Sequence, residues 1–191
     1  MNSLKKGDYG YLIQHRRRKL FATLTFALMI IFIVVTMLIM FGDTKRVAIV
    51  FAILLALPLA KYLIAFILCA GFLPLNKNDY AYIKKKTGDD FNELLFDMTI
   101  TKYEGARFYP VMLIKNGKIY AFVYESRLSK GKADYQTWIK DAVSQSKYEY
   151  KIFITSDIDE FIKKVLSVSQ PNHNNRLIDK HIRELIMEKG I

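Results

Sequence analysis

Three acidic residues in the second half of the chain have the chemistry that general acid–base catalysis or metal binding requires. Asp157 and Asp159 stand two residues apart directly after the apolar run YKIFITS, and Glu125 follows another apolar run. Neighbouring carboxylates can exchange protons with a substrate or bind a divalent cation. Acids also favour the first turn of a helix, where they interact with the helix dipole. We expect a helix capped by Ser156, with Asp157, Asp159 and Glu160 in its first turn.

The other residues that could bind a metal or a phosphate lack a recognisable spacing. His15, His173 and His181 are separated from the acids and from Cys69, the only cysteine. The sequence contains neither GxxxxGK[ST] nor GxGxxG, the patterns of common phosphate-binding loops. We therefore expect no metal, no cofactor and no catalytic residues.

A single lysine, Lys61, interrupts an otherwise apolar run, ALPLAKYLIAF. A charged lysine at the centre of a bilayer costs about 2.5–3.5 kcal/mol on insertion scales, so its side chain must reach polar surroundings. One interpretation is that it snorkels to the headgroups. A second is that it contacts a polar group of another membrane subunit or of a lipid, and a third is a role in transport.

Two apolar stretches are long enough to span a membrane. Residues 20–41 contain no charged residue, and as a helix they would be about 33 Å long, against about 30 Å for the hydrocarbon core of a bilayer. Residues 47–75 form the second stretch, and residues 42–46 (GDTKR) connect the two. The first stretch is too long for a cleaved signal peptide and ends without a small-residue cleavage site. The sequence therefore predicts a two-helix transmembrane hairpin.

Clustered cations indicate the orientation of this hairpin. Residues 1–19 form a basic segment that ends in HRRRK, directly before the first apolar stretch. Because cytoplasmic flanks are enriched in Lys and Arg, we expect both termini in the cytoplasm and the loop outside, at a plasma membrane. The frequent use of Lys, Ile, Tyr and Asn suggests a bacterial protein. Such a cluster also attracts the anionic lipids of the inner leaflet, at about 1 kcal/mol per cation. The predicted lipid contacts are Arg16, Arg17, Arg18 and Lys19.

Small residues recur at a spacing that favours close packing of membrane helices. In the first stretch Thr23 and Ala27 are four residues apart. The second stretch repeats alanine at the same interval, at Ala48, Ala52, Ala56 and Ala60. We expect this alanine face to pack either against the first helix or against another chain, which would be a partner membrane protein or a second copy.

Residues 76–170 predict a small mixed α/β domain. A short helix ending near Gly88 precedes an alternating strand that reaches Lys102. Two apolar runs then flank Asn116-Gly117, a pair typical of a type I′ hairpin turn. An amphipathic helix, a fourth strand and another helix follow, so we expect a three-stranded antiparallel meander with a helical crossover to a fourth strand. Residues 171–191 predict a linker and a C-terminal amphipathic helix.

This order of elements resembles the core of restriction-endonuclease-like folds. That family carries an acid at the start of its second hairpin strand and an acid-x-lysine triplet near the end of the next strand. The present sequence has PVM (residues 110–112) at the first place and VYE (residues 123–125) at the second. Its nearest triplet ends in Arg127, which stays charged and cannot shuttle a proton as lysine does. The resemblance concerns the layout of the fold and does not imply an active nuclease.

The positive charge of the chain is concentrated in its N-terminal part. The net charge of +11 arises mainly before residue 76, because residues 76–191 contain 20 Lys and Arg against 16 Asp and Glu. A nucleic-acid-binding domain would be more basic, so we expect no nucleic-acid partner. We expect an integral membrane protein that acts as a non-catalytic accessory, scaffold or regulatory subunit and presents its α/β domain at the inner membrane face. The alternatives are a membrane-bound enzyme that uses Glu125, Asp157 or Asp159, and a component of a transporter or channel.

Overall fold

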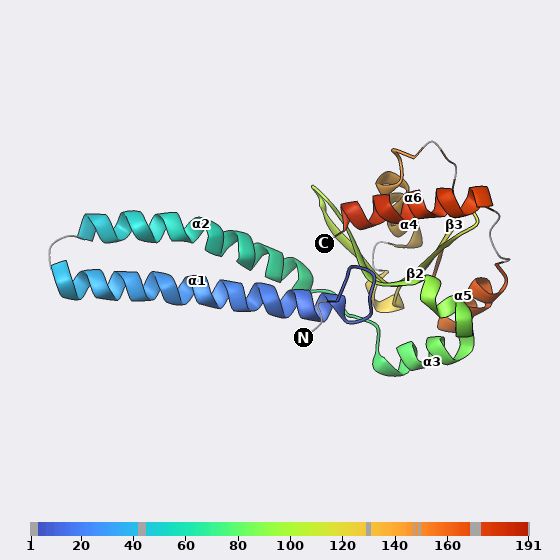
Figure 1. The fold of residues 1–191 in the computed structure, drawn as a ribbon, viewed down its shortest axis with the longest axis horizontal. Helices are drawn as coiled ribbons and strands as arrows, with labels where there is room; N and C mark the ends of the chain where they lie inside the picture. The colour runs from blue at the N-terminus through green and yellow to red at the C-terminus, as the bar shows by residue number, and fades with distance from the viewer. Residues whose placement is uncertain are drawn as a thin grey trace. The chain divides into compact units, whose positions relative to one another are not determined.

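Two compact units make up the protein in the computed structural model, which describes residues 4–41, 45–128, 131–146, 148, 150–168 and 173–190. One unit is a helical hairpin, Leu12–Phe72. The other is an α/β domain formed by Met1–Tyr11 together with Leu73–Ile191 (Figure 1).

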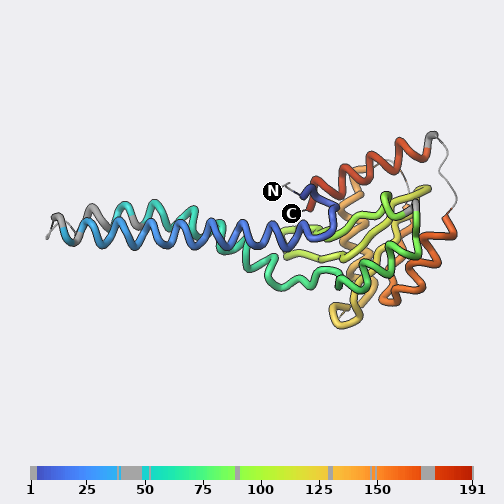
Figure 2. The backbone as a smooth tube through the Cα atoms, turned by 60° about the horizontal axis from the view of Figure 1, so that its bottom comes forward, coloured from blue at the N-terminus to red at the C-terminus, as the bar shows by residue number. Residues whose placement is uncertain are grey.

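The hairpin consists of α1 (Tyr11–Phe41) and α2 (Lys45–Ala70), which lie side by side in both ribbon views (Figures 1 and 2). The helix α1 begins well before residue 20, so the basic cluster is helical and continuous with the apolar stretch. The helix α2 ends at Ala70, before the end of the predicted stretch. Of the predicted loop, residues 42–46, the first three lie outside the described residues and the last two, Lys45 and Arg46, already belong to α2. Figure 1 also shows a bend in α2, which contains Pro58.

An aromatic pair joins the two helices of the hairpin. The ring of Phe26 on α1 stacks on that of Tyr62 on α2, with a centroid separation of 5.4 Å, and the Lys19 ammonium lies 5.3 Å from the Tyr62 ring centroid. Half-buried side chains recur at helical spacing around this pair. We call this set the seam: Thr23, Phe26, Ala27 and Ile30 on α1, and Leu55, Leu59, Tyr62 and Phe66 on α2.

The α/β domain is built on a four-stranded mixed sheet. Its strands are β1 (Leu94–Lys102), β2 (Gly105–Lys115), β3 (Lys118–Phe122) and β4 (Lys151–Thr155), in the order β1-β2-β3-β4. The first three strands are antiparallel and β4 pairs with β3 in parallel. This arrangement confirms the predicted meander and crossover.

The β2–β3 turn has the conformation that its sequence predicts. Asn116 and Gly117 have φ angles of +54° and +65°, as a type I′ turn requires. Lys115 and Lys118 pair across the turn, which fixes the register of the hairpin. Asparagine and glycine tolerate positive φ better than other residues, so this local pair determines the strand alignment.

Helices cover both faces of the sheet. On one face, α4 (Gly131–Ala142) and α6 (His173–Lys189) bury Trp138, Ile139, Ile182 and Ile186 against the strands. On the other face, α3 (Lys77–Thr87) and α5 (Ile158–Leu166) bury Ile83, Phe161 and Val165. Two short 3₁₀ helices, η1 (Gly88–Glu93) and η2 (Glu125–Arg127), complete the domain.

The N-terminal residues belong to this domain and extend its sheet at the β1 edge. The Phe96 amide donates to the Gly7 carbonyl oxygen at 2.8 Å, and the Gly10 amide donates to Asp97 Oδ2 at 2.8 Å. The Lys6 ammonium donates to two carbonyl oxygens at the C-terminal end of α6, at 3.0 and 3.3 Å. This pairing was not predicted from the sequence, and together with the bridge between Ile100 and Gly190 it covers part of the β1 edge.

Candidate functional site

The two acids of the DxD pattern take part in local structure. The side chain of Asp157 accepts a hydrogen bond from the Asp159 amide at 2.8 Å and caps α5. The prediction of Ser156 as the cap is therefore wrong by one residue, because it is Asp157 that has the extended backbone and the reach. The Asp159 carboxylate accepts a hydrogen bond from the Tyr82 hydroxyl at 2.7 Å. Asp157 thus stabilises the start of α5, and Asp159 links α5 to α3.

Glu125 and Asp157 follow the ends of neighbouring strands. Phe122 at the end of β3 pairs with Thr155 at the end of β4, so the chain leaves both strands at the same side of the sheet. Both acids are exposed. Within the described part of the chain, no three His, Cys, Asp or Glu side chains come together as a metal site.

The predicted membrane residues lie on different sides of the hairpin. Lys61, Ala56 and Ala60 are exposed, and the side chains of Ala48 and Ala52 lie outside the described residues. The described alanines therefore do not face the seam, and contact of this face with another chain stays a prediction. Thr23 and Ala27 are half-buried on the seam.

The predicted lipid contacts belong to α1, and the cysteine belongs to α2. Arg17 and Arg18 are exposed, whereas Arg16 and Lys19 are half-buried. Their contact with anionic lipid stays a prediction. Cys69 near the end of α2 is fully buried.

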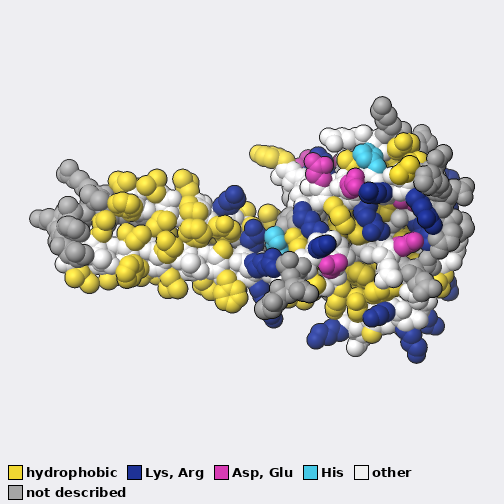
Figure 3. Space-filling model, viewed as in Figure 1, with side chains coloured by type: hydrophobic (Ala, Val, Ile, Leu, Met, Phe, Trp, Pro, Cys, Tyr) yellow, Lys and Arg dark blue, Asp and Glu magenta, His cyan; other side chains and the backbone are white. Residues whose placement is uncertain are grey.

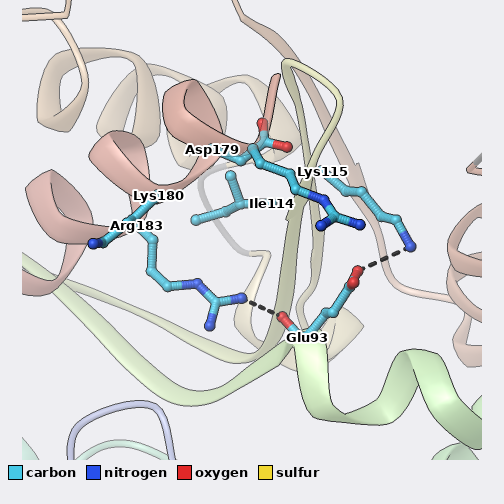
Figure 4. Close-up of a pocket in the computed structure, with 7 residues that line it drawn as sticks. Glu93, Ile114, Lys115, Asp179, Lys180 and Arg183 are labelled. Atoms are coloured by element: carbon cyan, nitrogen blue, oxygen red, sulfur yellow. Dashed lines mark hydrogen bonds and ion pairs between the residues drawn. The ribbon is translucent and has the colours of Figure 1, made fainter. Parts of the chain in front are cut away.

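A basic cavity of about 290 Å³ lies in the α/β domain between α6, the end of β2 and η1 (Figure 4). Its apolar floor is Ile114, which is buried. Four cationic and two acidic side chains surround this floor: Lys115, Arg176, Lys180, Arg183, Glu93 and Asp179. We refer to it as the α6 cavity.

Both acids of the α6 cavity are bound within the domain. Lys115 is only 2% exposed, and its ammonium lies 2.9 Å from Glu93 Oε2. The buried carboxylate of Asp179 accepts hydrogen bonds from the amides of Asn116 and Gly117, at 2.8 and 3.1 Å. The charge of Glu93 is therefore balanced by Lys115, whereas Asp179 keeps its charge and is hydrogen-bonded to the turn.

Three cations of α6 remain at the α6 cavity. Arg183 donates to the backbone oxygen of Glu93 at 2.7 Å, as the dashed line in Figure 4 marks. Burial lowers the pKa of Arg183, although the Glu93 and Asp179 carboxylates act in the opposite direction. Arg176 and Lys180 are exposed at the same cavity. The arrangement is a half-enclosed surface with excess positive charge.

Sequence reasoning had not identified this site, although one signal was present. Arg176, Lys180 and Arg183 follow one another at intervals of four and three residues, which places them on one side of a helix. The apolar residues on the other side of the same helix gave the more obvious pattern. No protein-family model, curated protein or solved structure matches the chain.

Proposed function

We propose that this chain is an integral membrane protein whose α1–α2 hairpin anchors the α/β domain at the cytoplasmic face of a bacterial plasma membrane. In this proposal the domain is a non-catalytic accessory, scaffold or regulatory unit. The observation that carries the proposal is the apolar outer surface of the hairpin: in Figure 3 most of the coloured side chains on the visible side of its described part are hydrophobic.

The exposure of individual side chains supports a lipid environment. Leu28 and Phe32 on α1 are 65% and 71% exposed, and Leu57 on α2 is 70% exposed. An apolar surface of this extent is unfavourable in water and suits the hydrocarbon core of a bilayer. Both helices are also long enough, since the spans Tyr11–Met37 and Ile49–Ala70 contain 27 and 22 residues and are about 40 and 33 Å long.

The basic cluster supports cytoplasmic termini. Arg16, Arg17, Arg18 and Lys19 lie within α1, directly before its apolar part. Cations at this position favour the cytoplasmic side and interact with anionic headgroups of the inner leaflet. Because the cluster is helical, its cations would be held close to the headgroup layer.

The surroundings of the acids support a non-catalytic role. Asp157 caps α5, and Asp159 accepts a hydrogen bond from the Tyr82 hydroxyl, so both carboxylates have structural partners. Lys61 and the exposed alanines Ala56 and Ala60 offer the hairpin a surface for a membrane partner or a second copy. A membrane-embedded accessory subunit would use such a surface.

Cysteine labelling in intact cells tests the anchoring and the orientation. In a Cys69→Ser background, Thr44→Cys should react with a membrane-impermeant maleimide from outside. Glu104→Cys, at an exposed position of the α/β domain, should react only after permeabilisation. Labelling of Glu104→Cys in intact cells would contradict the orientation, and release of the chain by alkaline carbonate would contradict insertion.

Purification from lightly crosslinked membranes tests the accessory role. A second protein recovered in a fixed ratio to this chain supports an accessory or scaffold subunit. Recovery of the chain alone, as a monomer that retains an enzymatic activity, would contradict it. Loss of the complex in Lys61→Leu with normal membrane insertion would place the contact on the hairpin.

A further inference from the structure

We propose that the α6 cavity binds a phosphate monoester through Arg176, Lys180 and Arg183. This binding site goes beyond the anchoring role of the hairpin, because all of its residues belong to the α/β domain. Figure 4 shows the Arg183 guanidinium directed toward Glu93 and the Lys180 side chain directed away from it, at the outer side of the site.

The charge arrangement of the cavity favours an anionic ligand. Glu93 is paired with Lys115 at 2.9 Å, and Asp179 accepts two backbone hydrogen bonds from the β2–β3 turn. The three remaining side chains, all from one helix, are cations. A phosphate monoester carries a charge of about −1.5 to −2 near neutral pH, which three cations can balance.

Arg183 gives the site its geometric specificity. Among the described residues, its hydrogen bond to the Glu93 carbonyl oxygen uses one of its five N–H donors. This bond fixes the guanidinium in a partly buried position at the cavity. A planar guanidinium can form two parallel hydrogen bonds with phosphate oxygens, and partial burial strengthens them.

The size of the cavity limits the ligand. A volume of about 290 Å³ is near the lower end of the range for small-molecule sites. It accommodates a phosphate group and a small part of the molecule that carries it, with Ile114 as an apolar contact. The phosphate group can come from an anionic lipid headgroup or from a soluble phosphorylated metabolite, and the experiment separates these sources.

The test uses the full chain in nanodiscs and the temperature of its unfolding transition. A ligand that binds only the folded state raises this temperature according to its concentration and affinity. Inorganic phosphate is titrated at constant ionic strength into nanodiscs of phosphatidylcholine alone. In a second arm, nanodiscs with one part phosphatidic acid to four parts phosphatidylcholine are used without free phosphate.

The decisive variant is Arg176→Gln combined with Lys180→Gln, because both side chains are exposed and their loss should leave the fold intact. We expect its apparent affinity for phosphate to fall by about tenfold or more. The matched control, Lys85→Gln with Lys163→Gln, removes two exposed lysines from α3 and α5 and should behave as the wild type. Arg183→Gln should also weaken binding.

Stabilisation of the wild type by free phosphate, lost in the α6 variant, supports a soluble ligand. Stabilisation by phosphatidic acid alone, lost in the same variant, supports a lipid headgroup. If neither phosphate nor phosphatidic acid stabilises the wild type, the proposal is overturned. It is also overturned if the Lys85 and Lys163 control loses the stabilisation to the same extent, because the effect would then be unspecific attraction to surface charge. Failure of this test leaves the anchoring proposal intact, because that proposal depends on cysteine labelling of the hairpin.

Discussion

The carboxylate of Asp179 on α6 lies 2.8 Å from the amide nitrogen of Asn116, in the turn between β2 and β3. The same carboxylate accepts a second hydrogen bond from the next amide, at 3.1 Å. A charged acceptor therefore satisfies two neighbouring donors of a turn whose residues have positive φ. This contact attaches α6 to the β2–β3 turn at the border of the α6 cavity.

Asp179→Ala should destabilise the α/β domain. The substitution leaves two amides of the turn without their charged acceptor, so we expect the free energy of unfolding to fall by about 2–3 kcal/mol. Urea unfolding of the full chain in detergent measures this through the fluorescence of Trp138, the only tryptophan, which is buried against the sheet. Glu184→Ala on the exposed side of α6 is the control, and an equal loss in that variant would contradict the assignment.

Gly7→Ala should release the N-terminal segment from the edge of β1. Gly7 has a φ of +92°, and a Cβ atom there would lie 2.9 Å from Leu95 Cδ2. Left-handed backbone costs about 1–2 kcal/mol for a residue with a side chain, before any clash. Hydrogen exchange at the Phe96 amide, which donates to Gly7, should therefore accelerate about tenfold or more. Gly71→Ala meets open space and should leave that exchange unchanged.

The sequence predicted those parts of the fold that depend on local signals. The Asn116-Gly117 pair determines its turn by backbone preference alone, and the apolar runs of β1 and β2 mark these segments as strands that are buried along most of their length. The apolar side of α6 at Ile182 and Ile186 was predicted by helical spacing in the same way. These signals act within a few residues, so a single sequence contains them.

Features that depend on contacts between distant segments could not be predicted. Residues 4–10 show no strand pattern, and their place on β1 is determined by the Gly7 and Gly10 hydrogen bonds to residues far along the chain. The α6 cavity was missed for the same reason. Its three α6 cations share one side of a helix in the sequence, but their closeness to Glu93 and to the buried end of β2 depends on contacts that the sequence does not indicate.

Tyr124→Phe should change the dependence of stability on alkaline pH. Burial raises the pKa of Tyr124 to about 12, and a hydrogen bond donated to Asp79 acts in the same direction. A raised pKa in the folded state means that this contribution is fully present below pH 10 and is lost as the pH rises toward 12. Tyr124→Phe should therefore weaken the alkaline loss of stability in this range.

The same variant should also be less stable at neutral pH. It removes a hydroxyl that donates to Asp79 and accepts from the Asn76 amide, so we expect a loss of about 1 kcal/mol. Urea unfolding at neutral pH and at two alkaline pH values measures both effects. Tyr103→Phe, at a fully exposed position, is the control, and an identical pH profile for Tyr124→Phe and wild type would contradict the burial effect.

Ala27→Leu should loosen the α1–α2 hairpin, whereas Ala56→Leu should not. Ala27 lies half-buried on the seam next to Phe26, so a larger side chain must separate the helices. Ala56 is exposed on α2, where leucine meets no seam residue. Overpacking of this kind costs about 1–3 kcal/mol in well-packed interiors.

A short bis-maleimide that joins Phe26→Cys to Tyr62→Cys in a Cys69→Ser background reports the helix separation, because the two native rings are 5.4 Å apart. The yield of intramolecular crosslink should fall clearly with Ala27→Leu and remain at the parental level with Ala56→Leu. Equal yields in both variants would contradict the seam as described. If the alanine face contacts another chain, Ala56→Leu should instead reduce recovery of that chain from crosslinked membranes, while the hairpin crosslink forms normally.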